Sequence, residues 1–454
     1  MRLPTNDVIA ALGGSVVNRE RLPGTIAVST DTRAIRPSET FLALRGEHFD
    51  GHRFVATAVK NGASAVIVDD AAALPEGDAG FVVADTLAAY LALGALARER
   101  LRGAVIAVSG STGKTTTKTF VLQALEAAGR AAVATPENEN NEIGVAKFLL
   151  SLDDGDPRIA IVEMGARKYR DLDPLVRAAR PDIAVLTNIG EAHLEIMGSR
   201  ERLAETKWGL FAGGAHAVLN LADDEVRARV PALTGPRSWF GIDAERPAAG
   251  ERAVIVRIDD VLAIAGETSR AFPLQVDLPG DYNRRNLAAA LAAAWAAGVD
   301  PAIVVAAAPH FALPHGRYER LAIAGGPTVI YDAYNASMSG ALATLSAFAR
   351  ERARRRIVVL GSMAELGADA AAMHAYVGAA AVAAADIVLV GGDYAGALSA
   401  GARDAGIAPG ALVTYTTNDE AIAWLRSNAR SDDLVLLKGS RMYHMEQIVA
   451  GLSA

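Results

Sequence analysis

The sequence predicts an α/β fold of three domains, in which the central domain is built on a parallel sheet and the C-terminal domain is Rossmann-like. One observation is that short apolar runs alternate with helical patterns along most of the 454 residues. Another is the loop SGSTGKTTT, at 109–117, which joins an apolar run to a helical pattern. A chain of this length forms about two to four domains. The boundaries that we expect are 1–98, 99–316 and 317–454.

The composition narrows the classes of function. A net charge of −7, from 45 basic and 52 acidic residues, argues against broad binding to nucleic acid, which needs many phosphate-facing Lys and Arg side chains. The absence of cysteine excludes disulfides, thiolate catalysis and cysteine-based zinc sites. The N-terminus lacks a signal-peptide pattern, and the most apolar stretch, 287–299, is shorter than the ~20 residues of a membrane span. We therefore expect a cytoplasmic protein with no nucleic-acid or membrane partner, and we expect a monomer.

The N-terminal domain is expected to combine short strands with helices. The runs 41–44 and 65–68 are apolar and strand-like. Between them lies the polar, glycine-marked loop RGEHFDGHRF, at 45–54, which leads into a helix. A helical periodicity over 86–101 carries the chain into the next domain.

The central domain shows the strand–helix alternation most clearly, which predicts a mostly parallel sheet covered by helices. Its expected strands are 104–108, 159–163, 183–187 and 216–219, and its expected helices include 114–128, 143–152, 200–211 and 283–297. The region 236–280 is less regular, with shorter strand-like pieces and several prolines.

The C-terminal domain is expected to be a second α/β unit of Rossmann-like pattern. Its expected strands are 328–332, 356–360, 386–390, 411–415 and 433–437. No G-x-G-x-x-G follows its first strand, so a dinucleotide site is not expected there.

The loop SGSTGKTTT departs from the general phosphate-binding pattern G-x-x-x-x-G-K-[ST], because Val108 stands where that pattern has its first glycine. Gly110 and Gly113 nevertheless allow the loop to curl around phosphate, and the helix N-terminus that follows favours anions. Lys114 would contact the outer phosphates, and the Thr115 hydroxyl would bind Mg²⁺. The alternative is a polar turn before a helix. ATP is favoured over GTP because the guanine motif N-K-x-D is absent.

Three further residues bear on a metal site, with unequal support from their positions. Glu163 ends an expected strand, at the sheet edge where ligands of parallel sheets bind, so it is a candidate Mg²⁺ ligand. His193 lies on the loop after the next expected strand, where a histidine is usually an ordinary surface residue. Lys207 lies in a helical stretch, and nothing in its spacing distinguishes it from a solvent-facing lysine.

A series of motifs along the whole chain resembles the Mur ligases, the ATP-dependent amide ligases of peptidoglycan precursor synthesis. After SGSTGKTTT come ENENNEIG (137–144), EMGA (163–166), TNIGEAHLEIMGS (187–199), ETKWGLF (205–211), DYNRRNLAAA (281–290), GRYE (316–319), DAYNAS (332–337), GSMAELG (361–367) and LKGSR (437–441). The N-terminal DTR (31–33) and FLALRGEHFDGHRF (41–54) are similar to the UDP-binding domain of the later ligases of the pathway.

The resemblance implies roles for individual residues around ATP and two Mg²⁺ ions. It implies catalytic roles for Lys114, His193, Lys207 and Arg317, and magnesium ligation by Thr115, Glu163, His193 and Lys207. Lys207 matches a lysine that is carbamylated in most of the family, which turns an ammonium into a carboxylate-like group. The nucleotide contacts that the resemblance implies are Gly110, Ser111, Thr112, Gly113, Lys114, Thr115, Thr116, Asn283, Asn286, Arg317 and Asp332.

The resemblance also implies the other substrates. DAYNA and GSMAELG are most similar to the members that add D-alanyl-D-alanine to UDP-N-acetylmuramoyl-tripeptide. The D-Y-A-H-T-P-like and Asp-Asn-Pro-Arg motifs of the neighbouring ligase are absent. Diaminopimelate and lysine both remain open as the third peptide residue. The substrate-binding residues that the resemblance implies are Thr32, Arg33, Gly46, Asp50, Asn138, Asn141, Tyr334 and Asn335.

The chain departs from the family pattern at a few positions. Tyr282 replaces the usual histidine before the Asn-x-x-Asn pair, and Ser362 replaces the usual aspartate of G-D-M-x-E-L-G. Ser337-Met338 replaces Asn-Pro, and Glu139 replaces a hydrophobic residue. Since the last three lie in parts expected to face the peptide substrates, they bear on the acceptor more than on the type of reaction.

The expected reaction is ATP-driven amide formation that yields ADP. The terminal carboxylate of the peptide attacks the γ-phosphate, and the amine of the acceptor then displaces phosphate from the acyl phosphate. Three alternatives remain open at this point. They are a Mur-type ligase with a different amine acceptor, a regulatory P-loop ATPase, and a catalytically inactive sugar-nucleotide-binding protein.

Overall fold

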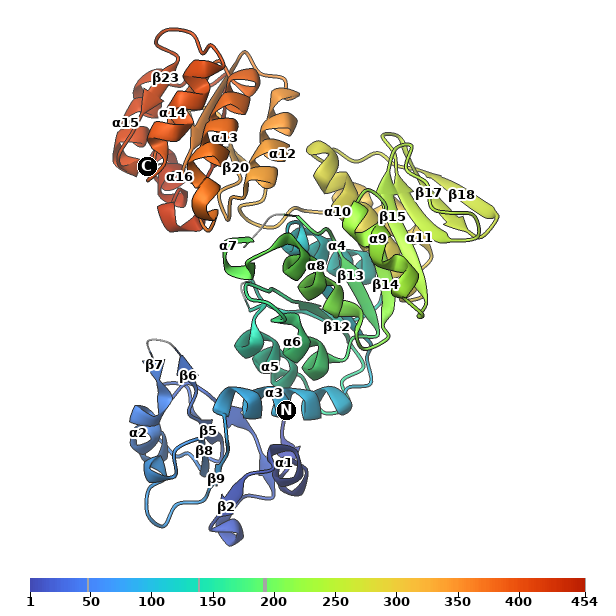
Figure 1. Cartoon of the computed structure of the whole chain (residues 1–454), viewed down its shortest axis with the longest axis vertical. Coiled ribbons are helices and arrows are strands. Elements are labelled where there is room, and N and C mark those ends of the chain that lie inside the picture. The colour runs from blue at the N-terminus through green and yellow to red at the C-terminus, as the bar shows by residue number, and fades with distance from the viewer. Residues whose placement is uncertain (47–48, 138, 191–193, 454) are drawn as a thin grey trace.

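A computed structural model describes residues 1–46, 49–137, 139–190 and 194–453 of the chain. Within them, a five-stranded, a nine-stranded and a six-stranded sheet follow one another along the sequence, together with two small two-stranded sheets. Figure 1 shows the N-terminal and C-terminal parts at opposite ends of an elongated molecule, with the central part between them. The expected α/β class with three sheet-based domains is confirmed.

The N-terminal part is built on the sheet order β2-β9-β8-β5-β4, parallel except where β2 (Ser15–Val17) pairs with β9. Its other elements are β1 (Leu3–Pro4), α1 (Thr5–Leu12), β3 (Thr25–Ile26), β4 (Val28–Ser29), β5 (Thr40–Leu42), β6 (Arg45–Gly46), β7 (Phe49–Asp50), α2 (Val55–Lys60), β8 (Ala65–Val68), β9 (Gly80–Val82) and α3 (Thr86–Glu99). Strand β8 coincides with the expected run 65–68, and strand β5 overlaps the expected run 41–44.

Helix α3 joins the N-terminal part to the central part. Asp85 caps its N-terminus by accepting a hydrogen bond from Ala88 N at 2.9 Å. Its Gly94 lies so close to the next part of the chain that a Cβ there would be 3.1 Å from Ala146 Cα. Arg98, at its C-terminal end, pairs with Asp182 at 2.8 Å. One continuous apolar core therefore runs from the N-terminal sheet through α3 into the central domain.

The central sheet has the order β11-β12-β10-β13-β14-β15-β16-β17-β18, parallel as far as β16 and antiparallel beyond it. Its strands are β10 (Val105–Ser109), β11 (Ala132–Ala134), β12 (Ile159–Glu163), β13 (Ile183–Leu186), β14 (His216–Asn220), β15 (Arg237–Ile242), β16 (Arg252–Val256), β17 (Asp260–Ala265) and β18 (Thr268–Pro273). The region 236–280, expected to be less regular and to hold shorter strand-like pieces, contributes four strands of five or six residues that extend the main sheet.

Helices cover both faces of the central sheet. Strands such as β10 and β12 are therefore buried along their whole length. These helices are α4 (Lys114–Ala127), α5 (Glu142–Ser151), α6 (Leu172–Ala179), α7 (Leu194–Met197), α8 (Arg200–Trp208), α9 (Asp224–Arg229), α10 (Gly280–Ala296) and α11 (Pro301–Ala307). The alanine-rich α10 is buried against α4 and the sheet, where small side chains allow close packing.

The C-terminal part has the sheet order β19-β20-β24-β21-β22-β23, parallel except for β19. Its elements are β19 (Glu319–Ala322), β20 (Thr328–Tyr331), α12 (Met338–Ala349), β21 (Arg355–Leu360), α13 (Ala370–Ala384), β22 (Ile387–Val390), α14 (Ala395–Asp404), β23 (Leu412–Thr414), α15 (Asn418–Asn428), β24 (Asp433–Lys438) and α16 (Glu446–Ser453). The five expected strands are present, and β19 is an additional one.

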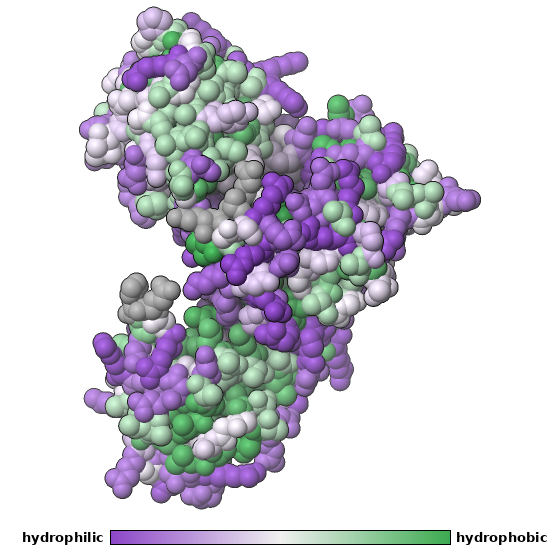
Figure 2. All heavy atoms as spheres, viewed as in Figure 1, coloured by the Kyte–Doolittle hydropathy of each residue, from purple (hydrophilic) through white to green (hydrophobic). Residues whose placement is uncertain are grey.

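The C-terminal part meets the central part mainly through α10 and α12. Gly280, at the start of α10, lies so close to α12 that a Cβ there would be 2.9 Å from Ala347 Cβ. Figure 2 shows hydrophilic side chains gathered over the central helices, and an outline that is hollowed between the N-terminal and C-terminal parts. Among the described residues, no helix is both long and apolar enough to cross a bilayer.

Candidate active site

The candidate active site lies at the carboxyl ends of β10, β12 and β13. Register places Val108 beside Glu163 on one side, and Ser109 beside Leu186 on the other. The loop 109–113 leaves β10 at this edge and leads into α4. Because the carboxyl ends of neighbouring parallel strands meet here, the site is where ligands of open α/β sheets bind.

Two glycines give the loop its shape. Gly110 has a φ of 146°, and a Cβ there would lie 1.9 Å from Thr187 Oγ1. Gly113 has a φ of 80°, and a Cβ there would lie 2.4 Å from Asn286 Oδ1. A side chain is excluded at both positions, by space and by backbone conformation. The shortened pattern without a glycine at Val108 is therefore a complete loop.

The segment after β13 holds the loop from the other side. Thr112 N donates to Asn188 Oδ1 at 3.1 Å, and Asn188 Nδ2 donates back to Thr112 Oγ1 at 2.9 Å. Thr187 Oγ1 donates to Thr112 O at 2.6 Å. Gly190 N donates to Ser111 Oγ at 2.9 Å. The loop is thus fixed in place before any ligand binds.

Lys114 begins α4 and turns back over this loop. Its Nζ donates to Gly110 O at 2.8 Å and to Ser111 O at 3.2 Å. Burial lowers the pKa of Lys114, Glu163 opposes that shift, and the positive charge of Arg317 adds to it. The Lys114 side chain therefore lies over the loop, where its ammonium could bind an anion held by the loop.

Glu163, at the end of β12, is almost fully buried between polar partners. Its Oε1 accepts from Asn140 Nδ2 at 2.9 Å and from Thr115 Oγ1 at 3.3 Å. Burial would raise its pKa, but the charges of Lys118 and Lys114 and the hydrogen bond from Asn140 outweigh burial and hold the pKa below its ordinary value. Glu163 is therefore an ionised carboxylate beside the hydroxyl of the loop threonine.

These groups fit a magnesium–nucleotide complex. A carboxylate and a hydroxyl are hard oxygen ligands, which Mg²⁺ prefers together with phosphate oxygens. Glu163 Oε1 lies beside the Thr115 hydroxyl, whereas the buried Oε2 lies 3.2 Å from Lys118 Nζ. Thr115 and Glu163 could thus hold the metal, while Lys114 and the N–H groups at the start of α4 could hold the phosphates.

Lys207 lies on α8, and its side chain is buried rather than solvent-facing. Burial lowers its pKa well below the ordinary value, and the nearby charge of Lys114 lowers it further, against the attraction of Asp171. Among the described residues, its ammonium has no hydrogen-bond or ion-pair partner. Burial therefore favours the neutral amine of Lys207 over its ammonium. His193, also expected here, lies outside the described residues.

Asn283 and Asn286 lie on the first turns of α10, behind the loop, and both are buried. Asn286 Nδ2 donates to Asn283 Oδ1 at 3.3 Å, and Asn286 Oδ1 accepts from Thr117 Oγ1 at 3.4 Å. The first turn of α10 is thus joined to α4 and to Gly113. Tyr282 packs beside them against the C-terminal core, and its hydroxyl has no hydrogen-bond partner within the described chain.

Two arginines from the C-terminal side share one aromatic ring. The guanidinium of Arg317 lies 4.3 Å from the centre of the Tyr334 ring, and that of Arg441 lies 5.1 Å from it. Neither arginine has a carboxylate partner among the residues that the structure describes. The positive charge of Arg317 also lowers the pKa of Lys114, so this arginine of the pair lies near the loop.

Asp332 is an internal anchor rather than an exposed side chain. It accepts from Tyr318 N at 3.1 Å and from Thr344 Oγ1 at 2.6 Å, and it pairs with Lys438 Nζ at 2.9 Å. Lys438 also donates to Asn335 O at 2.9 Å. Asp332 therefore holds the segments that carry Arg317 and Asn335 at the carboxyl edge of the C-terminal sheet.

The expected substrate residues of the N-terminal side lie in the N-terminal part of the chain, whereas the loop belongs to the central part. Arg33 is exposed and pairs with Asp31, and Thr32 O accepts from Asn61. Gly46 is the last residue of β6, and Asp50 is the last residue of β7 and pairs with Arg45. Asn141 caps α5 through Gly144 N at 2.9 Å. Asn138 lies outside the described residues.

Several contacts of the site were missed by sequence reasoning. Asn140, Asn188 and Arg441 lie within quoted motifs, but nothing in their spacing distinguished them. Lys118 and Thr135 carry no motif signal, because their contacts join segments that are distant in sequence. Only the strand-end position of Thr135 could have drawn attention to it.

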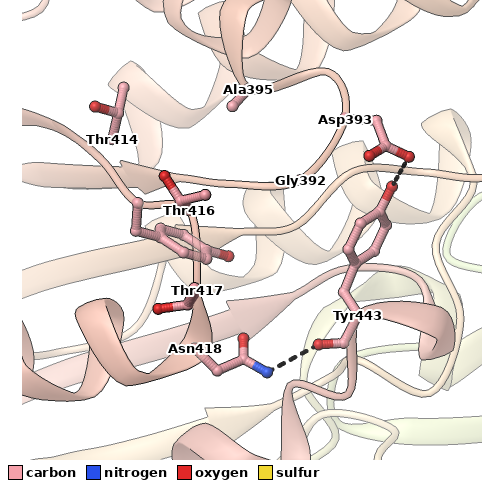
Figure 3. Close-up of a pocket in the computed structure, with 9 residues that line it drawn as sticks. Gly392, Asp393, Ala395, Thr414, Thr416, Thr417, Asn418 and Tyr443 are labelled. Atoms are coloured by element: carbon pink, nitrogen blue, oxygen red, sulfur yellow. Dashed lines mark hydrogen bonds between the residues drawn. The ribbon is translucent and has the colours of Figure 1, made fainter.

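A cavity of about 530 Å³ opens at the carboxyl ends of β22 and β23 (Figure 3). Tyr443 OH donates to Asp393 Oδ2 at 2.9 Å on one side of it, and Asn418 Nδ2 donates to Tyr443 O at 3.0 Å. None of the expected site residues lines it. It lies at the same edge of the C-terminal sheet as Asp332, across β21 and β24.

Family models match all three parts of the chain. The Mur ligase family catalytic domain matches residues 26–97, the Mur ligase middle domain matches 108–294, and the Mur ligase glutamate ligase domain matches 316–441. The chain belongs to the Mur ligase family. The middle-domain match spans the loop, Glu163 and Lys207.

Similar Mur ligases agree on the kind of member. The UDP-N-acetylmuramoyl-tripeptide–D-alanyl-D-alanine ligase of Synechocystis sp. is 34% identical, over 94% of this chain and 92% of its own length. MurF from Acinetobacter baumannii has a TM-score of 0.85 at 28% identity, covering 100% of this chain and 99% of that one. MurF from Thermotoga maritima, solved in complex with ADP, has a TM-score of 0.78 at 27% identity, covering 94% and 96%.

Proposed function

We propose that this Mur ligase adds D-alanyl-D-alanine to UDP-N-acetylmuramoyl-tripeptide, with cleavage of ATP to ADP, in peptidoglycan precursor synthesis. The observation that carries the proposal is the loop 109–113 closed against Asn188 with Glu163 beside Thr115, in a chain whose relatives over nearly its full length bear this name. The enzyme would act in the cytoplasm as a monomer.

The loop and its surroundings would bind and polarise the triphosphate. Lys114 would exchange its two loop carbonyls for the outer phosphates, and Arg317 would approach from the C-terminal side. Two Mg²⁺ ions, held through Thr115, Glu163, Lys207 and His193, would supply neutralisation of phosphate charge. Asn283 and Asn286 would hold the adenine. Catalysis would rest on positioning and on charge stabilisation of the transferred phosphoryl group.

The peptide carboxylate would attack the γ-phosphate to give an acyl phosphate. The amine of the dipeptide would then attack the acyl carbon, and inorganic phosphate would leave. Because Arg317 and Tyr334 belong to the C-terminal side and Lys114 to the central domain, both sides must approach for the site to be complete.

Lys207 would be carbamylated. Its buried, neutral amine would attack CO₂ to form a carbamate, with release of one proton. The carbamate carries a negative charge, so it can approach a metal ion without the repulsion that an ammonium would meet. The support for this proposal is the burial of Lys207 together with the low pKa that burial imposes.

The two ends of the peptide substrates would lie on opposite sides. Thr32, Arg33, Gly46 and Asp50 would bind the UDP-sugar end, with the segment that contains Asn138 and Asn141 facing the sugar. Tyr334 and Asn335 would face the acceptor, which would enter from the carboxyl edge of the C-terminal sheet.

The test is a coupled assay with ATP, Mg²⁺, UDP-N-acetylmuramoyl-tripeptide and D-alanyl-D-alanine that measures both ADP and the pentapeptide product. The expected result is one ADP for each amide formed. Ligation of another amine instead would reject the acceptor and keep the ligase class. ATP hydrolysis without any amine requirement would indicate a regulatory ATPase.

A further inference from the structure

Lys118 is a buried cation that the reaction proposed above does not use. It lies on α4, one turn after Lys114 and on the same face of the helix, and its side chain is 5% exposed. A lysine in that position normally reaches solvent. Here Nζ donates to Thr135 O at 2.8 Å and lies 3.2 Å from Glu163 Oε2. The ammonium is therefore enclosed between α4, β12 and the end of β11.

Thr135 ties this cation to the strand that carries the carboxylate. Its carbonyl accepts from Lys118, and its hydroxyl accepts from Glu163 N at 3.0 Å. The backbone and the side chain of Glu163 are thus both fixed by the same small network. A buried charge needs such a partner, because desolvation of an unpaired ion is costly.

The two oxygens of Glu163 consequently have different surroundings. Oε1 faces Thr115 and Asn140, whereas Oε2 faces Lys118. Only Oε1 is presented to the place where a metal would sit beside the Thr115 hydroxyl. Lys118 also cancels the charge of Glu163, and Lys114 adds a second positive charge close by.

We infer that Lys118 is a positioning residue that makes cation binding at Glu163 depend on bound nucleotide. With its charge neutralised and one oxygen turned away, Glu163 holds a free divalent cation weakly. The phosphates of the nucleotide supply the missing negative charge, so metal and nucleotide enter together. The inference rests on the magnesium site of the proposed function.

The two possible roles of Lys118 predict opposite results. If Lys118 only bridged α4 and β11, its loss would weaken the binding of every ligand or leave the binding of cations unchanged. If it neutralises Glu163, its loss removes a positive charge a few ångströms from the cation, and affinity for the free cation rises. A gain of affinity cannot come from simple loosening of the fold.

The experiment measures Mn²⁺ binding by electron paramagnetic resonance, with and without ADP, for the intact chain and for Lys118→Gln. Glutamine keeps a donor for Thr135 O but removes the charge. Without ADP, the variant is expected to bind Mn²⁺ at least about tenfold more tightly than the unaltered chain. With ADP, both should bind, and the difference should shrink. Lys60→Gln, at an exposed position of α2, is the matched control.

A second variant guards against misfolding. Lys118→Met combined with Glu163→Gln replaces the ion pair by neutral side chains of similar size, and it should fold without gaining affinity for free Mn²⁺. Equal Mn²⁺ affinities without ADP for the unaltered chain and a folded Lys118→Gln would overturn the inference. No Mn²⁺ binding by the unaltered chain even with ADP would instead reject the metal site itself. If Lys118→Gln does not fold, a gain of affinity in folded Lys118→Met would support the inference, and no gain would reject it.

Discussion

Lys114 Nζ donates a 2.8 Å hydrogen bond to the carbonyl oxygen of Gly110, four residues earlier in the same loop. The lysine that would contact phosphate is thus held by the loop itself. A phosphate that enters the loop must compete with this carbonyl for Lys114 Nζ. The shape of the loop therefore affects how tightly the nucleotide binds.

Gly110→Ala is expected to weaken ADP binding by at least about tenfold, because a Cβ would collide with Thr187 Oγ1 and the backbone has a positive φ. Titration calorimetry with ADP measures the effect. Gly396→Ala, in α14, has nothing within 4 Å of the added Cβ, and its ADP affinity should match the unaltered chain. Equal affinities for both variants would contradict the assigned loop.

Tyr334→Leu is expected to raise the KM for ATP by about two- to thirtyfold. The ring holds Arg317 by a cation–π contact, and such contacts contribute about 0.5–2 kcal/mol. Tyr334→Phe keeps the ring and should stay close to the unaltered KM. Steady-state kinetics at saturating peptide substrates separates the two. An equal loss in both variants would assign the effect to the hydroxyl instead.

His374 is expected to make the C-terminal part less stable below about pH 6.5. Its Nε2 accepts from Met363 N at 2.8 Å and its Nδ1 donates to Ala370 O at 2.6 Å. The bond to Nε2 needs the neutral ring and is lost when the ring takes up a proton. Burial lowers its pKa from the ordinary value of 6.5. Below pH 6.5 the unfolded chain takes up a proton that the folded chain does not. The free energy of unfolding therefore decreases as the pH falls from about 6.5 to the lowered pKa of the folded state.

Urea unfolding between pH 5 and 8 tests this expectation. His374→Gln should lose stability at pH 8 and show a flatter pH dependence between about pH 5 and 6.5. His310→Gln, at an exposed position, should keep the slope of the unaltered chain. A slope that is unchanged in His374→Gln would place the titrating group elsewhere.

Lys207→Met is expected to abolish ligation, with a loss of at least about 100-fold, while raising the melting temperature at neutral pH. The neutral side chain removes the cost of burying an amine whose pKa burial has lowered. Native mass spectrometry of the unaltered enzyme should show one added CO₂. Full activity with an unmodified lysine would refute the carbamate.

The strands of the central sheet were predictable where they are apolar and long, as in β10 and β12. β11 was missed because three residues after a glycine turn give too little pattern. The strands β15–β18 were expected only as shorter strand-like pieces of a less regular region. β18 is mostly exposed and ends at a proline, and all four strands are held by pairing that extends the parallel sheet, which no single segment reveals.

Glu163 was predictable from position alone, since a carboxylate at a strand end of a parallel sheet lies where ligands bind. Lys118 was not, because its partner carbonyl lies 17 residues further along the chain and its carboxylate still further. The burial of Lys207 likewise follows from how α8 packs, and a single helical lysine carries no sign of it.

Helix α3 packs the N-terminal part against the central part through the close approach of Gly94 to Ala146, and the two share one apolar core. With the UDP-sugar end on the N-terminal sheet and the carboxylate to be activated beside Glu163, as proposed, this packing would hold the span between them constant. The distance between the two sites would then select the length of the peptide substrate. A stem peptide one residue too short would bind by its nucleotide and still leave its carboxylate out of reach of the phosphate, so length is read before the acceptor arrives.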